Sequence, residues 1–127
     1  MKGDHNNPRW KGGKRRLYRE RFKALGLPCA ICKGELGAID YTTSDAKAPL
    51  GFVVDEIIPI SKYYLAGYNS KEEAANDWNN LQPAHRICNA MKGNKVNYTF
   101  KGIQADHARK QQQATLEHKP LKLDGKW

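Results

Sequence analysis

Four side chains with the spacing of metal ligands occur in two short pairs. Cys29 and Cys32 form the first pair, and His85 and Cys88 form the second, with two residues between the members of each pair. Thiolate and imidazole groups suit a structural zinc ion, which prefers four nitrogen or sulfur ligands in a tetrahedron. Three free thiols in a reducing cytosol are the simpler alternative, but the two pairs favour zinc. A secreted disulfide framework is not expected, because three cysteines cannot all pair within one chain.

A second set of candidate ligands carries oxygen in place of sulfur. Asp55 lies in a stretch of β-branched residues, and Asn89 follows the last cysteine directly. Carboxylate and amide oxygens suit hard cations, and Mg²⁺ takes few protein ligands because it keeps several waters. A divalent ion of this kind can stabilise the charge that develops during phosphodiester hydrolysis. The residues therefore suggest a nuclease site beside a structural zinc.

One amphipathic helix is predicted ahead of the first cysteine pair. Apolar and basic residues alternate with helical spacing from residue 14 to residue 25, and Gly26 suits the C-terminal stop. We expect Leu17, Phe22 and Leu25 to face the core. The basic side chains are then expected to point outward: Arg15, Arg16, Arg19 and Lys23.

Two strands and a capped helix are predicted between the two ligand pairs. Residues 38–43 and 51–58 have the composition of strands, the second being rich in β-branched residues and followed by a proline. A capping-box pattern begins a helix at Ser70 that runs to about Trp78. The acidic Asp55 is thereby placed near the end of the second strand.

The second ligand pair falls in a predicted helix. Pro83 suits the first turn of this helix, and Gly93 suits its end. At about 100° per residue, the two zinc ligands share one face with two further polar residues, while apolar residues share another. The polar face carries His85, Cys88, Asn89 and Lys92, and the apolar face carries Ala84, Ile87 and Met91.

Length and composition indicate one small domain with flanking segments. The chain has 127 residues, 39% of them apolar, and a mean hydropathy of −0.80, and small domains with sparse cores often depend on a metal. We expect a flexible arm over 1–10, a domain over 11–95, and a C-terminal segment over 96–127 with a polar helix at 104–117 and a tail of ten residues. No membrane-spanning run and no signal peptide are recognisable, which predicts a cytoplasmic protein.

Positive charge is concentrated at the N-terminus. The chain carries a net charge of +9, and residues 1–27 hold nine Lys and Arg against two acidic residues, a net of +7. Such an asymmetry is typical of proteins that bind polyanions, most simply nucleic acid. A solvated basic helix that aids solubility is the alternative. Arg15, Arg16 and Arg19 are the residues we expect to contact backbone phosphates, together with Lys92 near the candidate metal site.

Taken together, these motifs resemble the HNH endonucleases, particularly the compact phage and prophage type. The resemblance covers roughly residues 10–95 and rests on four elements in the family's order: the basic segment from Trp10, and the stretches 29–32, 54–61 and 80–93. It implies a small α+β fold, a ββα-metal core in which a β-hairpin and a helix clasp one divalent cation around a structural zinc. It also implies cleavage of DNA with Mg²⁺ or Mn²⁺, and a role beside phage packaging proteins.

Residue roles follow from the same resemblance. Asp55 and Asn89 match ligands of the catalytic cation, and Asn80 matches an asparagine that shapes the loop over the site. Glu56 stands where the family usually has a histidine that acts as general base. His85 stands where many relatives have a cysteine, and histidine is an ordinary zinc ligand.

The substitution at Glu56 leaves three roles open. A free glutamate has a pKa of about 4.3 against about 6.5 for histidine, so it is a weaker base. Glu56 could still be the base, it could be a second metal ligand, or it could mark an inactive site. Adjacent strand residues point to opposite faces, so Asp55 and Glu56 can serve one site only where the strand bends or ends.

The function predicted from the sequence is a metal-dependent DNA endonuclease. A non-catalytic, zinc-stabilised DNA-binding module that has lost its general base is the main alternative, and a zinc scaffold for a protein partner is the third. Each alternative predicts a different experiment: cleavage with divalent metal, salt-dependent binding without cleavage, or no retention of DNA. The sequence leaves sequence specificity, strand nicking against double-strand cleavage, and oligomeric state open.

Overall fold

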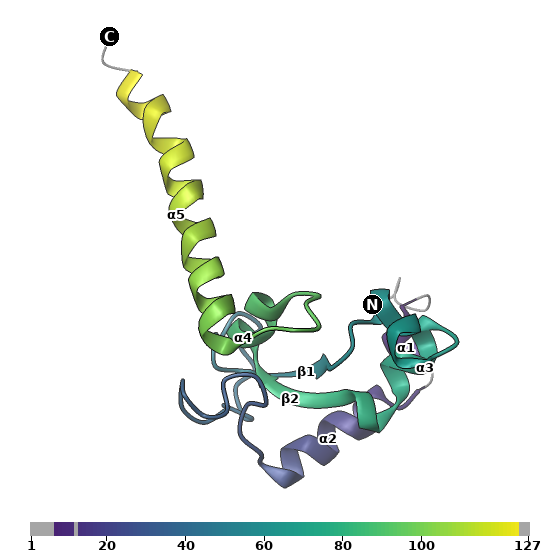
Figure 1. Ribbon diagram of the computed structural model, residues 1–127. Coiled ribbons are helices and arrows are strands. Elements are labelled where there is room, and N and C mark those ends of the chain that lie inside the picture. The colour runs from purple at the N-terminus through teal and green to yellow at the C-terminus, as the bar shows by residue number, and fades with distance from the viewer. Residues whose placement is uncertain (1–6, 12, 125–127) are drawn as a thin grey trace. The chain divides into compact units, whose positions relative to one another are not determined.

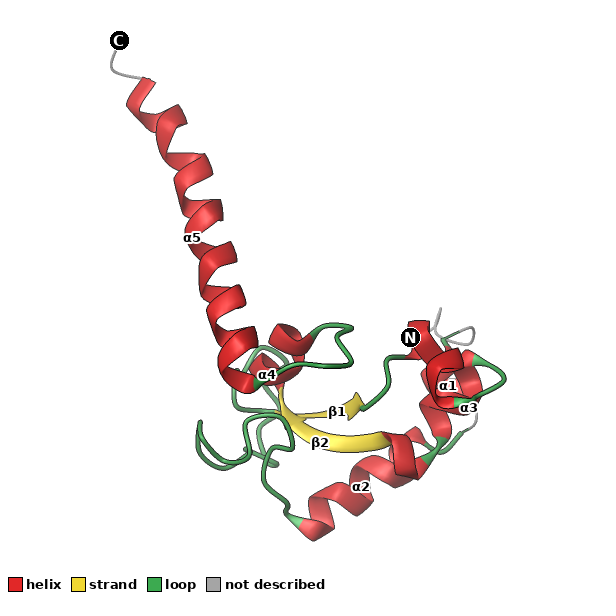
Figure 2. Cartoon of the chain, viewed as in Figure 1, coloured by secondary structure: helices red, strands yellow, loops and turns green. Residues whose placement is uncertain are grey.

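The computed structural model describes residues 7–11 and 13–124, and the side chains of residues 7–10 and 13–115. The chain divides into two units, residues 1–96 and residues 97–127. The N-terminal unit is a small α+β fold with a two-stranded antiparallel sheet (Figures 1 and 2). Within the described part of the C-terminal unit, the regular structure is one helix.

The sheet pairs two segments that are distant in the sequence. β1 spans Phe52–Glu56 and β2 spans Leu81–His85, and the register places Val54 opposite Pro83. β1 lies inside the predicted strand 51–58 and confirms it. β2 was not predicted, because Pro83 suggested the first turn of a helix.

Pro83 is tolerated in β2 because of the direction in which its backbone points. Its carbonyl accepts a hydrogen bond of 2.9 Å from the Ala30 N–H. In a strand the N–H and C=O of one residue point to the same side, so the missing N–H of Pro83 would also have pointed away from β1. The proline therefore removes no hydrogen bond from the β1–β2 ladder, and its carbonyl ties the first cysteine pair to the sheet.

The strand predicted over 38–43 is wrong. Within this segment the structure has a single isolated bridge, between Asp40 and Gly51, and the remainder is loop. The Asp40 carboxylate instead accepts hydrogen bonds from the main-chain N–H groups of Thr42 and Thr43. Such local bonds compete with strand pairing, which explains why this short polar segment turns.

The basic helix is confirmed, but its buried face differs from the predicted one. α2 spans Arg15–Leu25, and the Gly26 N–H bonds to the Phe22 carbonyl with Gly26 in the left-handed conformation. Phe22 is buried as predicted, but Leu17 and Leu25 are 63% and 54% exposed. The buried face consists of Arg15, Tyr18 and Phe22.

Aromatic residues hold α2 against the sheet. The ring of Phe22 stacks on Trp78 with centroids 4.4 Å apart, and Tyr18 lies against the same indole at 5.3 Å. Phe22 also meets Phe52 of β1 edge-on at 6.3 Å. Three elements that are separate in sequence therefore share one small aromatic core.

Short helices complete the N-terminal unit. α1 (Pro8–Lys11) covers the end of the segment predicted to be an arm and extends one residue past it, and residues 1–6 of that arm lie outside the described residues. α3 (Lys71–Asn76) begins at Ser70 as predicted, with the Ser70 hydroxyl accepting from the Glu73 N–H, and it lies beside α1 (Figure 1). The 3-10 helices η2 and η3 span Ile60–Ala66 and Trp78–Asn80.

α4 (Arg86–Lys92) follows β2 without a loop. The helix predicted from Pro83 therefore begins three residues later, and His85 is the last residue of β2. In the C-terminal unit, α5 (Phe100–Asp124) is longer than the helix predicted over 104–117 and includes most of the expected tail. None of the helices in the described part of the chain has the length and apolar character that crossing a membrane requires.

Candidate metal centre and adjoining cavity

The two ligand pairs come together in a buried Cys3His cluster. The ligand atoms of Cys29, Cys32, His85 and Cys88 all lie within 4.8 Å of one another, and all four residues are buried. The His85 Nδ1 atom lies 3.5 Å from the sulfur of Cys32 and 3.6 Å from that of Cys88. Four convergent ligands of this chemistry could bind a structural metal such as zinc.

Local backbone geometry prepares the first cysteine pair. The chain turns sharply after Cys32, where Lys33 and Gly34 adopt positive φ angles of 55° and 90°. The sulfur of Cys29 accepts hydrogen bonds from the main-chain N–H groups of Cys32 and His85 at 3.5 and 3.4 Å. Main-chain donors of this kind stabilise negative charge on a thiolate, the form in which cysteine binds metal.

The orientation of His85 is fixed from outside the cluster. Its Nε2 atom lies 3.2 Å from the carbonyl oxygen of Ala38, which can only accept a hydrogen bond. The Nε2 atom therefore carries the proton, and Nδ1 presents its lone pair to the three sulfur atoms. A metal-binding histidine held by a carbonyl through its other nitrogen is the usual arrangement in metalloproteins.

Burial opposes ionisation of part of the cluster. Desolvation, followed by the charge on Cys29, raises the pKa of the Cys88 thiol far above its usual range. At Cys32 desolvation acts in the same direction, but hydrogen bonds from the backbone of Leu36 and Gly34 outweigh it and lower the pKa. A bound cation would relieve the cost of the buried thiolates, because a coordinated thiol is deprotonated.

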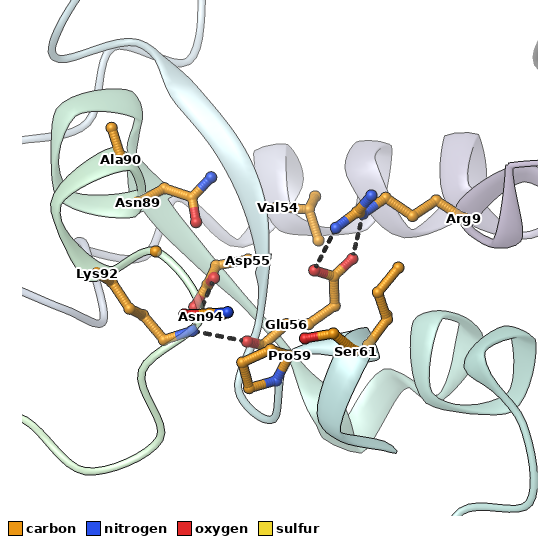
Figure 3. Close-up of a pocket in the computed structure, with 12 residues that line it drawn as sticks. Arg9, Val54, Asp55, Glu56, Pro59, Ser61, Asn89, Ala90, Lys92 and Asn94 are labelled. Atoms are coloured by element: carbon orange, nitrogen blue, oxygen red, sulfur yellow. Dashed lines mark hydrogen bonds and ion pairs between the residues drawn. The ribbon is translucent and has the colours of Figure 1, made fainter.

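A cavity of about 440 Å³ lies beside α4, between β1 and the loop that follows it. Figure 3 shows Asp55, Asn89 and Lys92 directed toward one another in this cavity, with Glu56 on its other side. Asp55 and Glu56 come from β1, and Asn89 and Lys92 come from α4. The cavity therefore gathers most of the candidate catalytic residues.

Asp55 is buried and already has a cationic partner. Its Oδ1 atom accepts a hydrogen bond of 3.1 Å from the Lys92 ammonium, and its Oδ2 atom accepts one of 2.8 Å from Gln82. Lys92 is 1% exposed, and it also donates to the Glu56 carbonyl at 2.9 Å. Desolvation raises the pKa of Asp55, although the charge of Lys92 acts against this shift.

Glu56 has a separate set of partners on the other side of β1 (Figure 3). Its carboxylate accepts hydrogen bonds from Arg9 at 2.6 and 3.1 Å and from Arg15 at 3.0 Å. Arg15 also donates to the Ala75 carbonyl at 3.2 Å. Although both carboxylates line the cavity, each is held by different cations.

The buried position of Arg15 corrects its predicted orientation. Arg15 is 4% exposed, whereas we expected it to point outward toward phosphate groups. Arg16 is exposed and Arg19 is partly exposed, and the role predicted for these two residues stays a prediction. The sequence also missed Arg9, which lies in the segment assigned to a flexible arm and carries no local signal of an ion pair.

Asn80 braces the loop that follows β1. Its Oδ1 atom accepts from the Ile58 N–H at 2.9 Å, and its Nδ2 group donates to the carbonyls of Ile58 and Ala74 at 3.1 and 3.0 Å. Asn80 is 3% exposed. The three bonds join the loop beside the cavity to the C-terminal half of α3.

Comparisons with known proteins leave the chain without an assigned relative. No family model matches it, and neither a curated protein nor a solved structure matches it significantly.

Proposed function

We propose that this chain is a metal-dependent DNA endonuclease of the HNH type. The observation that supports the proposal is that Asp55 of β1 and Asn89 of α4 line one cavity, next to a Cys3His cluster that shares α4 (Figure 3). The order of two antiparallel strands followed by a helix agrees with a ββα-metal core. In this proposal the cluster holds Zn²⁺, and Asp55 and Asn89 hold Mg²⁺ or Mn²⁺.

The donor set is compatible with a divalent ion at Asp55. A carboxylate offers about four lone-pair sites, and Gln82 and Lys92 occupy one on each oxygen of Asp55. The amide oxygen of Asn89 adds a neutral donor, and a sparse protein shell is what Mg²⁺ accepts. A bound divalent ion would supply charge stabilisation at the scissile phosphate.

Lys92 and Glu56 would assist hydrolysis from opposite sides of the cavity. Lys92 would have to leave Asp55 to contact a phosphate oxygen as predicted, because it is buried and donates to Asp55 and to the Glu56 carbonyl. Glu56 can accept a proton from the attacking water only after at least one arginine hydrogen bond has opened, because three such bonds now hold its carboxylate. Arg9 is the more exposed partner, and phosphate is a suitable competitor for its guanidinium.

One observation favours the second candidate, a DNA-binding module without hydrolysis. Arg9 and Arg15 neutralise Glu56, and Lys92 neutralises Asp55. Both acids can therefore be explained as partners in structural ion pairs. If these pairs persist when DNA binds, Glu56 cannot act as a base, and the charge of Lys92 opposes the binding of a divalent ion at Asp55. This candidate retains the zinc cluster and the affinity for DNA.

A plasmid-nicking assay distinguishes the two candidates. Zinc-loaded protein is incubated with supercoiled plasmid, with Mg²⁺, with Mn²⁺, or without added divalent ion. We expect metal-dependent nicking, reduced roughly a hundredfold or more in Asp55→Asn because the metal's charge stabilisation is lost. Asp106→Asn in α5 makes the same chemical change outside the N-terminal unit and should leave nicking unchanged.

Glu56→Gln then assigns the role of the glutamate. The amide keeps hydrogen-bond acceptor capacity toward Arg15 but cannot act as a base. Loss of nicking in this variant, with unchanged DNA affinity, would assign Glu56 as the base. Retained nicking would mean that water is activated without it, and absence of nicking by the wild type under every metal condition would support the DNA-binding module.

The wider role is also part of the proposal. The resemblance to compact phage nucleases suggests processing or packaging of phage DNA beside packaging proteins. The net charge of +7 in residues 1–27 supports DNA as the partner. A zinc scaffold for a protein partner would instead fail to retain DNA at moderate salt.

A further inference from the structure

A second cavity adjoins the candidate catalytic cavity. It measures about 260 Å³ and shares Arg9 and Val54 with the first cavity. The apolar side chains of Val53 and Val54 line it together with Trp10, which is 48% exposed. An exposed indole beside apolar side chains and arginines suits a flat heteroaromatic ring, because nucleobases stack on aromatic side chains and on guanidinium planes.

The arginines of this second cavity differ in how far their charge is neutralised. Arg9 and Arg15 both pair with Glu56. Arg19 has no ion-pair partner among the described residues, and its guanidinium lies over the ring of Phe52, 4.8 Å from the centroid. Arg19 is therefore the cation of this cavity that remains available to a phosphate group.

A third cavity continues from Arg19. It measures about 240 Å³ and brings Arg19, Lys23 and Arg86 together from α2 and α4. The Arg86 Nε atom is buried and has no hydrogen-bond partner in the described structure. A buried guanidinium N–H without a partner is costly, and a shift of the Arg86 side chain that opens this N–H to the cavity would let a phosphate oxygen accept from it.

Two acidic residues also line the third cavity, but main-chain groups engage both. Asp40 accepts hydrogen bonds from the N–H groups of Thr42 and Thr43, and Asp45 accepts one from the N–H of Lys47. Three cations face these two carboxylates, so the lining carries a net positive charge, and Lys23 also forms a surface ion pair of 3.7 Å with Glu20. Its chemistry is that of a phosphate contact.

We infer that the second and third cavities are subsites for one unpaired strand of DNA, with a base against Trp10 and a backbone phosphate among Arg19, Lys23 and Arg86. The inference rests on the contiguity of the three cavities. Arg9 and Val54 line both the first and the second cavity, and Arg19 lines both the second and the third. A base can reach an indole in this way only when it is out of the duplex stack. The inference rests on the proposed function in assigning the first cavity to the scissile phosphate.

The base subsite can be tested by binding without cleavage. A fluorescein-labelled single strand of about 12 nucleotides is titrated with zinc-loaded, full-length protein in the absence of Mg²⁺ and Mn²⁺, and anisotropy is recorded. Trp10→Ala should weaken binding roughly fivefold or more, and Trp10→Phe should retain most of the affinity. Tyr64→Ala, which removes an aromatic ring that is 62% exposed outside the cavities, is the matched control and should bind like the wild type.

The phosphate subsite has a different signature. In Lys23→Gln the slope of log Kd against log salt should fall by about 0.7, the value for one lost contact to a single strand. Lys71→Gln removes one exposed charge from α3, outside the three cavities, and should leave the slope unchanged. Trp10→Ala should change the affinity but not the slope, since it removes no charge.

Three results would overturn the inference: wild-type affinity in Trp10→Ala, equal slopes in Lys23→Gln and Lys71→Gln, or tighter binding of a duplex of the same length. Trp10 and Lys23 are exposed, so their replacement removes little packing, and an unchanged melting temperature checks that both variants fold. The result is separate from the nuclease test. Binding that depends on Trp10, without nicking, would support these subsites and contradict the proposed endonuclease activity. Nicking without Trp10-dependent binding would support the endonuclease and contradict the subsites.

Discussion

The Cys3His cluster and the neighbouring cavity neutralise buried charge in opposite ways. The sulfur atom of Cys29 in the cluster is held by main-chain N–H groups, and burial raises the pKa of Cys88. In the cavity, each carboxylate has a side-chain cation, Lys92 for Asp55 and two arginines for Glu56. The two sites share α4, which carries Cys88 of the cluster and both Asn89 and Lys92 of the cavity.

This difference predicts which of the two sites depends on a metal for folding. A cluster of buried thiols has its best partner in a cation that arrives from solution, so we expect metal binding and folding to be coupled at the Cys3His cluster. A carboxylate with its own lysine can be buried without a metal, and a divalent ion would compete with that lysine. We therefore expect the cluster to hold its ion permanently and the cavity to exchange its ion.

Removal of the cluster's metal should have the largest effect. Structural zinc contributes on the order of 10 kcal/mol in small zinc domains, so His85→Ala should abolish the cooperative unfolding of the N-terminal unit and lower the zinc content of the purified protein. His107→Ala, a histidine of α5 outside the cluster, is the control. Normal melting and a full complement of zinc in His85→Ala would contradict the proposed ligand set.

The next largest effect is expected at Lys92. Lys92→Met leaves the Asp55 carboxylate buried without its cation, which should lower the free energy of unfolding by about 3–5 kcal/mol. Because a divalent ion can replace the missing charge, Mg²⁺ or Mn²⁺ should raise the melting temperature of this variant more than that of the wild type. Lys101→Met, an exposed lysine of α5, should show neither change.

If Mg²⁺ and Mn²⁺ fail to raise the melting temperature of Lys92→Met, the cavity has no affinity for a divalent ion. The expected difference between the cluster and the cavity would then be wrong. The zinc content should stay at the wild-type level throughout. Loss of zinc would mean that the two sites are not independent.

A smaller effect is expected at Glu56. Glu56→Gln weakens the charged hydrogen bonds to Arg9 and Arg15, and we expect a loss of about 2 kcal/mol in chemical denaturation. Glu20→Gln on the exposed face of α2 should cost little, because its ion pair with Lys23 is at the surface. Equal stabilities of the two variants would show that the arginine pair does not support the fold.

The smallest effect concerns pH. Burial raises the pKa of Asp55 above its usual 3.8, so the folded chain keeps this proton at pH values where the unfolded chain has released it. Without a divalent ion, the contribution of Asp55 to stability is therefore fully present below pH 3.8 and is lost as the pH rises through the raised pKa. Bound Mg²⁺ requires the carboxylate, so its stabilising effect should grow over the same interval.

Differential scanning calorimetry with and without Mg²⁺ tests whether the stabilising effect of Mg²⁺ rises with pH. The rise in melting temperature on adding Mg²⁺ should increase with pH in the wild type and be absent in Asp55→Asn. Comparing the two proteins at each pH removes the contribution of the cysteine cluster, which loses its metal on acidification in both. A Mg²⁺ effect that decreases with pH would contradict the assignment of Asp55 as the ligand.

Local signals in the sequence determined the parts of the fold that depend on neighbouring residues. The spacing of the cysteine and histidine pairs predicted the cluster, and Gly26 and Ser70 marked the end of α2 and the beginning of α3. The β-branched stretch predicted β1. These signals succeed because a turn, a cap or a strand propensity is decided within a few residues.

Tertiary structure decided which side chains are buried and which charges meet. Pro83 fits both a first helical turn and a strand whose N–H points outward, and only the contact with Ala30 selects the strand. Arg15 is buried while Leu17 is exposed, because the small unit places an acid at that face of α2. Helical periodicity defines faces but cannot say which face meets an acid that comes from another element.

The ion pairs of Asp55 and Glu56 were likewise decided by the tertiary structure. Lys92 lies 37 residues from Asp55, and Arg9 lies 47 residues from Glu56. No local pattern links residues at such separations, because an ion pair depends on distance in space and on the loss of solvent around both charges. The sequence by itself determined the zinc-type ligand set and the acidic strand end, and the packing of α1, α2 and α4 around β1 determined how those acids are neutralised.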